Sequence, residues 1–431
     1  MDIEKLYELF KQHPVITTDS RDCPAGSIFF ALKGASFDGN KFALAALEKG
    51  CVAAVVDEEE YATDPRCLLT DNVLATLQQL ARHHRRVLGT KIIGITGTNG
   101  KTTTKELTAA VLSERYNVLY TQGNFNNDIG VPKTLLRLRP EHQIAVIEMG
   151  ASHPGDIKTL VNIVEPDCGI ITNVGKAHLQ GFGSFEGVIK TKGELYDFLR
   201  TRKDSVVFIH NENQHLLGIA HDLKLVKYGT ADDPSLYVGG RVADCSPFLH
   251  FQWRHEGGTW HDVKTQLIGS YNVYNMLAAA TIGLYFGVQP KQIDHALSHY
   301  TPTNNRSEFE VTAHNKLIVD AYNANPTSME AALKNFRDMA VSPKMVILGD
   351  MRELGKVSDE EHQKVVDFLE QCHLSDVWLV GEEFMKTRCS FRKFKDVEEV
   401  KAEISRQRPE GKYILIKGSN GIKLFQLPAL L

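Results

Sequence analysis

The chain has 431 residues, of which 42% are hydrophobic and 24% charged, a composition typical of a globular protein with about two to four domains. The net charge of −4 argues against a strongly basic nucleic-acid surface, and the seven scattered cysteines argue against a disulfide framework or a zinc knuckle. No apolar run approaches the ~20 residues of a membrane-spanning helix, and the N-terminus lacks a signal-peptide core, so we expect a cytoplasmic protein without membrane insertion.

Residues 1–88 alternate short apolar runs with helical patterns in which leucine and alanine recur every three or four positions. This alternation predicts a small α/β domain. Its predicted strands span residues 27–34 and 51–59, and its predicted helices span residues 1–13, 40–50 and 72–89.

A second predicted domain, residues 89–303, begins with β-branched, nearly all-apolar runs separated by helical stretches, the pattern of parallel strands buried on both faces. These runs occupy residues 91–96, 117–121, 143–150, 168–174 and 205–211. After His221 the pattern favours antiparallel strands, and Gly257-Gly258 indicates a hairpin turn. A helix is predicted at residues 272–287.

Polar, turn-rich residues 300–310 indicate a second boundary, followed by another βα alternation. Residues 304–431 are therefore predicted to form a Rossmann-like domain. Its predicted strands span residues 316–323, 344–350, 376–381 and 412–419, and its predicted helices span residues 327–340 and 358–372. The fold class is α/β with three domains: a parallel-sheet domain with an antiparallel addition lies between two smaller domains.

The stretch "GITGTNGKTTTKE" (94–106) resembles a phosphate-binding loop but departs from G-x-x-x-x-G-K-[ST], because Ile95 stands where the first glycine belongs. An apolar strand leads into it and a helix leaves it, so backbone N–H groups at the helix start can face phosphate oxygens. Lys101 would neutralise the β- and γ-phosphates of ATP, and the Thr102 hydroxyl would hold Mg²⁺. The rest of the predicted loop comprises Gly97, Thr98, Asn99, Gly100 and Thr103.

Three further side chains are candidates for the site, two at the ends of predicted strands and one on a predicted helix. Glu148 ends a buried strand at the edge where open α/β sheets bind ligands, which favours a metal role over simple exposure. His178 follows another strand end, where a lone histidine is more often structural. Lys192 lies on a predicted helix, where the residues alone indicate only a surface salt bridge.

Five segments share the order and spacing of the Mur ligases, the ATP-dependent amide-forming enzymes of peptidoglycan assembly. These segments are "GITGTNGKTTTKE", "TQGNFNNDIGVP", "EMGASHPGDI", "ITNVGKAHLQGFGS" and "GSYNVYNMLAA". The phosphate loop of that family has the form G-T-[ND]-G-K-[ST]-[ST], without the early glycine. Ile95 therefore agrees with the resemblance.

Two other stretches resemble particular branches of the family. "TDSRDCPAGSIFFALKGASFDGNKF" (18–42) is similar to the UDP-recognising domain of the third- and fourth-step ligases. "DAYNANPTSMEAAL" with "LGDMRELG" is similar to the fourth-step branch, which joins D-alanyl-D-alanine to UDP-N-acetylmuramoyl-tripeptide through an acyl phosphate. The aspartate-asparagine-proline-arginine signature of the third-step branch is absent. The resemblance thus implies ATP, that tripeptide and that dipeptide as partners of a monomer.

The resemblance also assigns roles to residues. It implies that Thr102 and Glu148 bind one Mg²⁺, that His178 binds a second, and that Lys192 is the lysine that relatives carbamylate to hold that second ion. Further implied contacts are Asn272 and Asn275 to adenine or ribose; Arg306, Asp320, Tyr322 and Asn323 to ATP from the C-terminal domain; Ser20, Arg21, Lys33, Gly34 and Asp38 to the UDP moiety; and Asn124, Asn126 and Asn127 to the muramoyl peptide. The chain departs from the family pattern at Tyr271, Ala321 and Asn420.

Other classes remain open on the residues alone. A sibling amide ligase, such as the third-step enzyme or a folylpolyglutamate synthase, is the nearest rival, although the folate enzyme lacks a UDP-binding domain. A phosphotransferase or NTP-driven switch would also use a phosphate loop, and so would a non-catalytic nucleotide-binding protein. Lys101 together with Glu148, His178 and Lys192 argues against this last class.

Overall fold

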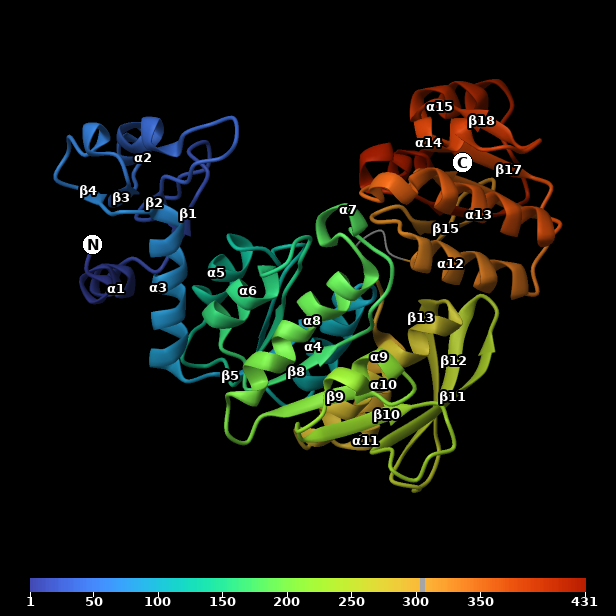
Figure 1. The fold of residues 1–431 in the computed structure, drawn as a ribbon, viewed down its shortest axis with the longest axis horizontal. Helices are drawn as coiled ribbons and strands as arrows, with labels where there is room; N and C mark the ends of the chain where they lie inside the picture. The colour runs from blue at the N-terminus through green and yellow to red at the C-terminus, as the bar shows by residue number, and fades with distance from the viewer. Residues whose placement is uncertain (303–306) are drawn as a thin grey trace.

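The computed structural model describes residues 1–302 and 307–431, whose strands form three sheets along the chain (Figure 1). In this view the N-terminal sheet lies at the upper left and the C-terminal sheet at the upper right of the large central one. The expected three-part α/β organisation is confirmed. Arg306, one of the predicted ATP-site residues, lies outside the described residues.

The N-terminal sheet has four parallel strands in the order β1-β2-β3-β4. Its elements are α1 (Ile3–Gln12), β1 (Ile16–Thr17), β2 (Ile28–Phe30), α2 (Ala43–Glu48), β3 (Ala53–Val56), β4 (Cys67–Leu69) and α3 (Val73–Leu88). The predicted helices and the strands at β2 and β3 are confirmed. The strands β1 and β4 were not predicted, because neither lies in a long apolar run like those that contain β2 and β3.

Helix α3 joins this sheet to the central one by packing against α5 (Gly130–Leu135) and α6 (Asp156–Val164). The Asn72 side chain caps its start, and Gly89, with φ +65°, follows its end. Glu165, just after α6, accepts hydrogen bonds from Arg82 Nε at 3.0 Å and Arg86 Nε at 2.8 Å. A carboxylate shared by two guanidinium groups thus fixes α3 against the central sheet.

The central sheet has nine strands in the order β13-β12-β11-β10-β9-β8-β5-β7-β6. They are β5 (Lys91–Thr96), β6 (Val118–Tyr120), β7 (Ile144–Glu148), β8 (Cys168–Ile171), β9 (Val206–His210), β10 (Leu225–Gly229), β11 (Val238–Cys245), β12 (Phe248–His255) and β13 (His261–Ile268). In β7 and β8 every residue is buried, as expected for parallel strands covered on both faces. Because β5 pairs in parallel with both β7 and β8, the carboxyl ends of these three strands lie at the same edge of the sheet.

The expectation that antiparallel pairing begins after His221 is wrong for β10 and β11. Both β9 and β11 pair with β10 in parallel, and only the β11–β12 and β12–β13 pairs are antiparallel. The helix α9 (Gln214–Ile219) provides the crossover that returns the chain to the same end of the sheet before β10. The hairpin turn is confirmed between β12 and β13, where Gly257 has φ +76°.

Three helices of the central part carry residues near the carboxyl edge of the sheet: α4 (Lys101–Ser113), α8 (Phe185–Arg200) and α10 (Val273–Tyr285). Helix α10 packs along α4 and is buried over most of its length, which explains its nearly uniform apolar sequence. The remaining central helices are α7 (Leu179–Phe182) and α11 (Pro290–His299).

The C-terminal sheet has the order β14-β15-β19-β16-β17-β18, with β14 antiparallel to β15 and the other pairs parallel. Its strands are β14 (Glu308–Val311), β15 (Lys316–Asp320), β16 (Lys344–Gly349), β17 (Val377–Val380), β18 (Arg392–Phe394) and β19 (Tyr413–Lys417). Its helices are α12 (Pro326–Asp338), α13 (Ser358–Gln371), α14 (Glu382–Lys386) and α15 (Val397–Arg406). Within the described ranges, no helix is long and apolar enough to cross a membrane.

Candidate active site

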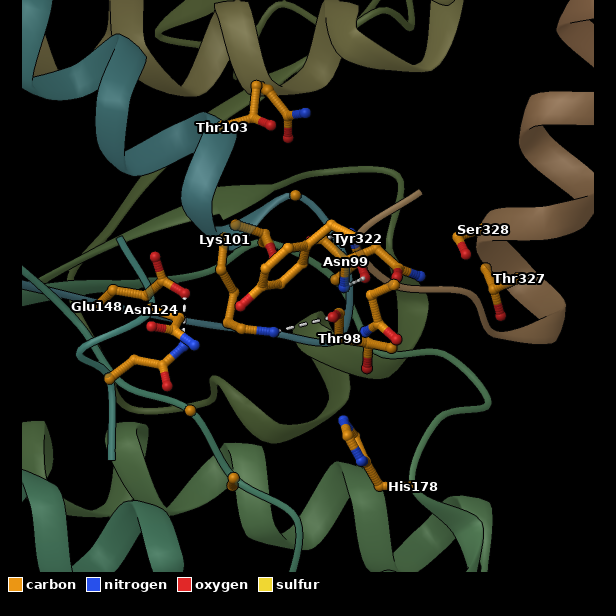
Figure 2. A pocket seen from close by; sticks show the side chains of 18 of the residues that line it. Thr98, Asn99, Lys101, Thr103, Asn124, Glu148, His178, Tyr322, Thr327 and Ser328 are labelled. Carbon is orange, nitrogen blue, oxygen red and sulfur yellow. Dashed lines mark hydrogen bonds between the residues drawn. The ribbon is translucent and has the colours of Figure 1, made fainter. Parts of the chain in front are cut away.

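A cavity of about 860 Å³ lies between the carboxyl edge of the central sheet and the C-terminal sheet. Figure 2 shows the phosphate-loop side chains on one side of it and Thr327 and Ser328 of α12 on the other. The structure brings many of the predicted residues together here. Those lining the cavity are Thr98, Asn99, Gly100, Lys101, Thr103, Asn124, Asn126, Asn127, Glu148, His178, Asn272, Asn275, Asp320, Tyr322 and Asn323.

The phosphate loop is short because β5 continues to Thr96. Ile95 is a fully buried strand residue paired with Glu148, so the backbone needs no glycine at this position. The turn begins at Gly97, where φ is +143° and a Cβ would lie 2.0 Å from Thr172 Oγ1. The departure from the common phosphate-loop pattern is therefore a longer strand and a later turn.

The residues after β8 hold this loop in place. The Thr98 N–H donates to the Asn173 carbonyl at 2.9 Å, and the Asn99 N–H donates to Asn173 Oδ1 at 2.9 Å. Thr172 Oγ1 in turn donates to the Asn99 carbonyl at 2.6 Å. Asn173 was not among the predicted residues, although it follows a strand end in the same way as Glu148.

Lys101 begins α4, and its side chain lies over the loop (Figure 2). Its Nζ donates to the carbonyls of Gly97 at 2.9 Å and Thr98 at 3.0 Å. Because the first N–H groups of a helix lack intrahelical acceptors, the start of α4 and the ammonium together offer a site for an anion.

Glu148, at the end of β7, is 1% exposed and lies against three side chains. Its Oε1 accepts from Thr102 Oγ1 at 3.2 Å and from Asn126 Nδ2 at 2.9 Å. Its Oε2 has no hydrogen-bond partner within the described ranges and lies 3.8 Å from the Nζ of the fully buried Lys105. Lys105 was not predicted, although it lies three positions after Thr102 and therefore on the same helix face.

These atoms fit a magnesium ion. A hydroxyl and a carboxylate are oxygen ligands, which Mg²⁺ prefers, and Glu148 Oε2 is a buried polar atom without a hydrogen bond. In residues 1–302 and 307–431 no cluster of three or more His, Cys, Asp or Glu side chains could hold a metal. With Mg²⁺ bound here, the chain would supply only part of the coordination shell, and phosphate oxygens and water would complete it.

His178, with φ +49°, stands at the start of α7, and its ring Nδ1 contacts the Glu353 carboxylate of the C-terminal sheet's β16–α13 loop. Burial lowers its pKa below the usual value, and Glu353 partly offsets that shift. Figure 2 shows the ring pointing toward the phosphate loop. Glu353 was not predicted, because only the folded chain brings it to His178.

Lys192 on α8 is 2% exposed and lies close to the same place. Its Nζ donates to the Ala151 carbonyl at 3.5 Å and lies 5.5 Å from the centre of the Phe182 ring, which packs on His178. Burial holds the pKa of the Lys192 amine well below its usual value, and the charge of Lys101 adds to this shift. The surface salt bridge that the residues alone indicated is therefore wrong, because this face of α8 is buried.

The asparagines of α10 reach the loop from the other side. Asn275 Nδ2 donates to Asn272 Oδ1 at 2.7 Å, and its Oδ1 accepts from Thr104 Oγ1 at 3.1 Å. Gly100, with φ +76°, lies so near that a Cβ would stand 2.7 Å from Asn275 Oδ1. The predicted nucleotide contacts therefore adjoin the predicted phosphate loop.

On the C-terminal side, Asp320 accepts from Lys417 Nζ at 2.6 Å, and the same Nζ donates to the Asn323 carbonyl at 3.3 Å. Lys417 is 1% exposed and lines the cavity, yet it was not predicted. The Tyr322 carbonyl accepts from the N–H of Asn420 at 3.1 Å. Asn420 therefore contributes at least this backbone contact.

The two other departures from the family pattern occupy defined places. Tyr271 lines the cavity and shares a 2.9 Å hydrogen bond with Ser307 Oγ, and burial raises its pKa. Ala321 is buried directly after β15. On the muramoyl side, Asn127 Oδ1 accepts from the Gly130 N–H at 2.8 Å, which supports the start of α5.

The predicted UDP residues lie in the loops that follow β1 and β2, and they do not line the cavity. Arg21 pairs with Asp19 at 2.8 Å, and Lys33 pairs with Asp57 at 3.0 Å and Glu58 at 2.7 Å. The remaining contacts are made by Asp38, which accepts from the Asn40 N–H, by Gly34, whose N–H donates to Phe37, and by Ser20, whose carbonyl accepts from Lys49.

Three family profiles match the chain. The profile described as "Mur ligase family, catalytic domain" matches residues 14–96, "Mur ligase middle domain" matches residues 95–283, and "Mur ligase, glutamate ligase domain" matches residues 305–420. The UDP-N-acetylmuramoyl-tripeptide–D-alanyl-D-alanine ligase of Bacillus subtilis is 35% identical over 96% of this chain and 92% of its own length.

Solved structures are similar as well. MurF from Acinetobacter baumannii is 31% identical, with a TM-score of 0.86 over 96% of this chain and 92% of that one. MurF from Thermotoga maritima in complex with ADP has a TM-score of 0.86 over 96% of both chains at 24% identity, which shows a shared fold.

Proposed function

The chain belongs to the Mur ligase family, and from this premise we propose that it uses ATP to join D-alanyl-D-alanine to UDP-N-acetylmuramoyl-tripeptide. The observation that carries the proposal is the cavity between the central and C-terminal sheets. Its central wall offers the phosphate loop with Lys101 and Glu148, and the opposite wall offers Asp320 and Tyr322. A phosphate donor and an acceptor can therefore meet in one cavity.

The chemistry requires activation, because a carboxylate has no leaving group that an amine could displace. The terminal carboxylate oxygen of the tripeptide attacks the γ-phosphorus of ATP, and ADP leaves. The dipeptide amine then attacks the carbonyl carbon of the acyl phosphate, loses a proton, and expels inorganic phosphate. One ATP is converted to ADP and phosphate for each amide formed.

The protein contributes charge and position more than covalent chemistry. Lys101 and the first turn of α4 neutralise phosphate oxygens, so that an anionic carboxylate can approach. Thr102 and Glu148 would hold Mg²⁺, which supplies further positive charge at the phosphates when bound. Asn126 orients Glu148 through its 2.9 Å hydrogen bond, and this links the muramoyl-side loop to the metal ligand.

We also propose that a second Mg²⁺ uses His178 and a carbamylated Lys192. A lysine adds CO₂ only as the neutral amine, forming a carbamate and releasing a proton, and burial favours that neutral form of Lys192. Incubation with ¹³C-bicarbonate should give a carbamate carbon signal that Lys192→Arg abolishes and that Lys190→Arg, on the exposed face of the same helix, retains. A signal that survives Lys192→Arg would exclude this modification.

The three parts of the chain divide the work in this proposal. Residues 1–88 bind the UDP moiety, residues 89–303 bind ATP, and residues 304–431 close the site. Because two of the substrates are cytoplasmic nucleotides, we place the enzyme in the cytoplasm, and we propose that it acts as a monomer.

One experiment tests the function. Phosphate release is measured with ATP, Mg²⁺ and UDP-N-acetylmuramoyl-tripeptide, with and without D-alanyl-D-alanine, and the product is identified by mass. The proposal requires release that depends on the dipeptide and stops when EDTA removes the metal. If phosphate release does not depend on the dipeptide, or depends on a free amino acid instead, the chain is another ligase of the family.

A further inference from the structure

The loop that carries His178 is held by a residue of the loop that follows β16. Glu353 lies between β16 and α13, and its carboxylate contacts His178 Nδ1. The carbonyl of the same residue accepts a hydrogen bond from the N–H of Gln180 at 3.3 Å. Glu353 thus contacts this segment twice, once through its side chain and once through its backbone.

Two more contacts join the same segment to the C-terminal helices. Lys176 Nζ pairs with Glu361 of α13 at 3.2 Å, and the Lys176 N–H donates to Thr327 Oγ1 of α12 at 3.3 Å. Gly175 lies so close that a Cβ would stand 2.9 Å from Thr327 Oγ1. These contacts hold the segment against the C-terminal helices α12 and α13. Among these partners, only Glu353 contacts the His178 ring.

The contact with Glu353 determines which nitrogen of the His178 ring can bind a ligand. A carboxylate only accepts hydrogen bonds, so the proton of a neutral ring lies on Nδ1, and Nε2 keeps its lone pair. His178 lines the cavity and its ring points toward the phosphate loop (Figure 2). A carboxylate on one nitrogen and a ligand on the other is the arrangement that orients histidine ligands in metal sites.

Stability gives a poor account of Glu353. Its side chain is 58% exposed, and an exposed ion pair contributes little to the free energy of unfolding. Its backbone has φ +63°, a conformation that residues other than glycine, asparagine and aspartate seldom adopt. The conformation directs the carboxylate at His178, which is a positioning role.

We propose that Glu353 is a positioning residue that fixes the tautomer and direction of the His178 ring, so that docking of the C-terminal sheet completes the reaction site. The proposal rests on the function proposed above. It makes site assembly depend on a contact between two parts of the chain 175 positions apart.

The test compares Glu353→Ala and Glu353→Asp with Lys176→Ala. Lys176→Ala removes the Glu361 ion pair from the same segment but leaves the His178 contact, so it controls for weaker docking alone. In nucleotide-free protein labelled with ¹⁵N-histidine, long-range NMR reports the ring tautomer, and His178→Gln assigns the signal. We expect the Nδ1–H form in the unmodified protein and in Lys176→Ala, and a shift toward Nε2–H in Glu353→Ala.

Turnover provides the second readout. Glu353→Ala should lower kcat about 10- to 100-fold with an unchanged Tm, as expected when the partner of a ligand histidine is removed, and Glu353→Asp should recover part of it. An unchanged tautomer in Glu353→Ala, or an equal loss in Lys176→Ala, would overturn the inference. If the unmodified protein makes no amide, the proposed function fails, while the NMR result still decides whether Glu353 orients His178.

Discussion

Asn325 Nδ2 donates a hydrogen bond to Asn99 Oδ1 at 2.7 Å, and Asn99 Nδ2 returns one to Asn325 Oδ1 at 3.4 Å. The two residues are 226 positions apart, one in the phosphate loop and the other at the start of α12. The start of α12 therefore contacts the loop that is expected to bind phosphate, and the two walls of the cavity are linked directly.

Asn325→Asp should weaken ATP binding without unfolding the protein. Aspartate keeps the oxygen that caps α12 by accepting from the Ser328 N–H at 2.9 Å, so the Tm should not change. It loses the donor to Asn99 and places a negative charge near the phosphates, so KM for ATP should rise about 10-fold or more. Asn335→Asp, which retains its acceptor for the Ser270 N–H at another contact between the sheets, should leave KM near normal.

Lys101→Ala should abolish turnover. The substitution removes the cation that lies over the loop, and losing one preorganised charge of this kind costs about 10²-fold or more in kcat. Phosphate release under saturating ATP measures the loss, with Lys158→Ala as an exposed lysine control. Near-normal turnover in Lys101→Ala would mean that the phosphate-loop assignment is incorrect.

Local sequence was enough for the central residues of the site. Lys101 and Thr102 follow a strand and begin a helix, and Glu148 ends a neighbouring strand, so their placement depends only on the rule for parallel sheets. Asn325, Glu353 and Lys417 could not be assigned this way, because their partners lie 226, 175 and 97 positions away. Their contacts depend on how elements distant in the chain pack together.

Some missed features did carry a signal. Asn325 precedes Pro326, a common start of a helix, so a cap at this position was foreseeable even though its contact with Asn99 was not. The direction of β10 was not foreseeable from its residues, because a strand with alternating burial can pair either in parallel or antiparallel. The crossover helix α9 decides that direction.

Lys33→Ala should affect the UDP-linked substrate alone. Lys33 lies in the loop after β2, outside the cavity, and its ion pairs with Glu58 and Asp57 hold its ammonium in one place and raise its pKa. Removing one charged contact to a diphosphate should raise KM for that substrate about 10-fold, with KM for ATP unchanged. Lys41→Ala, an exposed neighbour, is the matched control. An equal rise in KM for ATP would place Lys33 in a different role.

The unfolding free energy of the protein should depend on pH through Lys192. Its folded-state pKa is held well below normal by burial, whereas the unfolded amine titrates near about 10.4, so the unfolded chain binds one more proton between these values. Stability therefore rises with pH across that window, by up to about 1.4 kcal/mol per pH unit, and falls as the pH drops toward the folded-state pKa.

Lys192→Met lacks this dependence, so in CO₂-free buffer its stability advantage over the unmodified protein should shrink from pH 7 to 10. Urea unfolding at each pH measures the free energy of unfolding of both proteins, and Lys190→Met is the control at an exposed position. If the free energies of the unmodified protein and Lys192→Met change with pH in parallel, Lys192 is charged in the folded state.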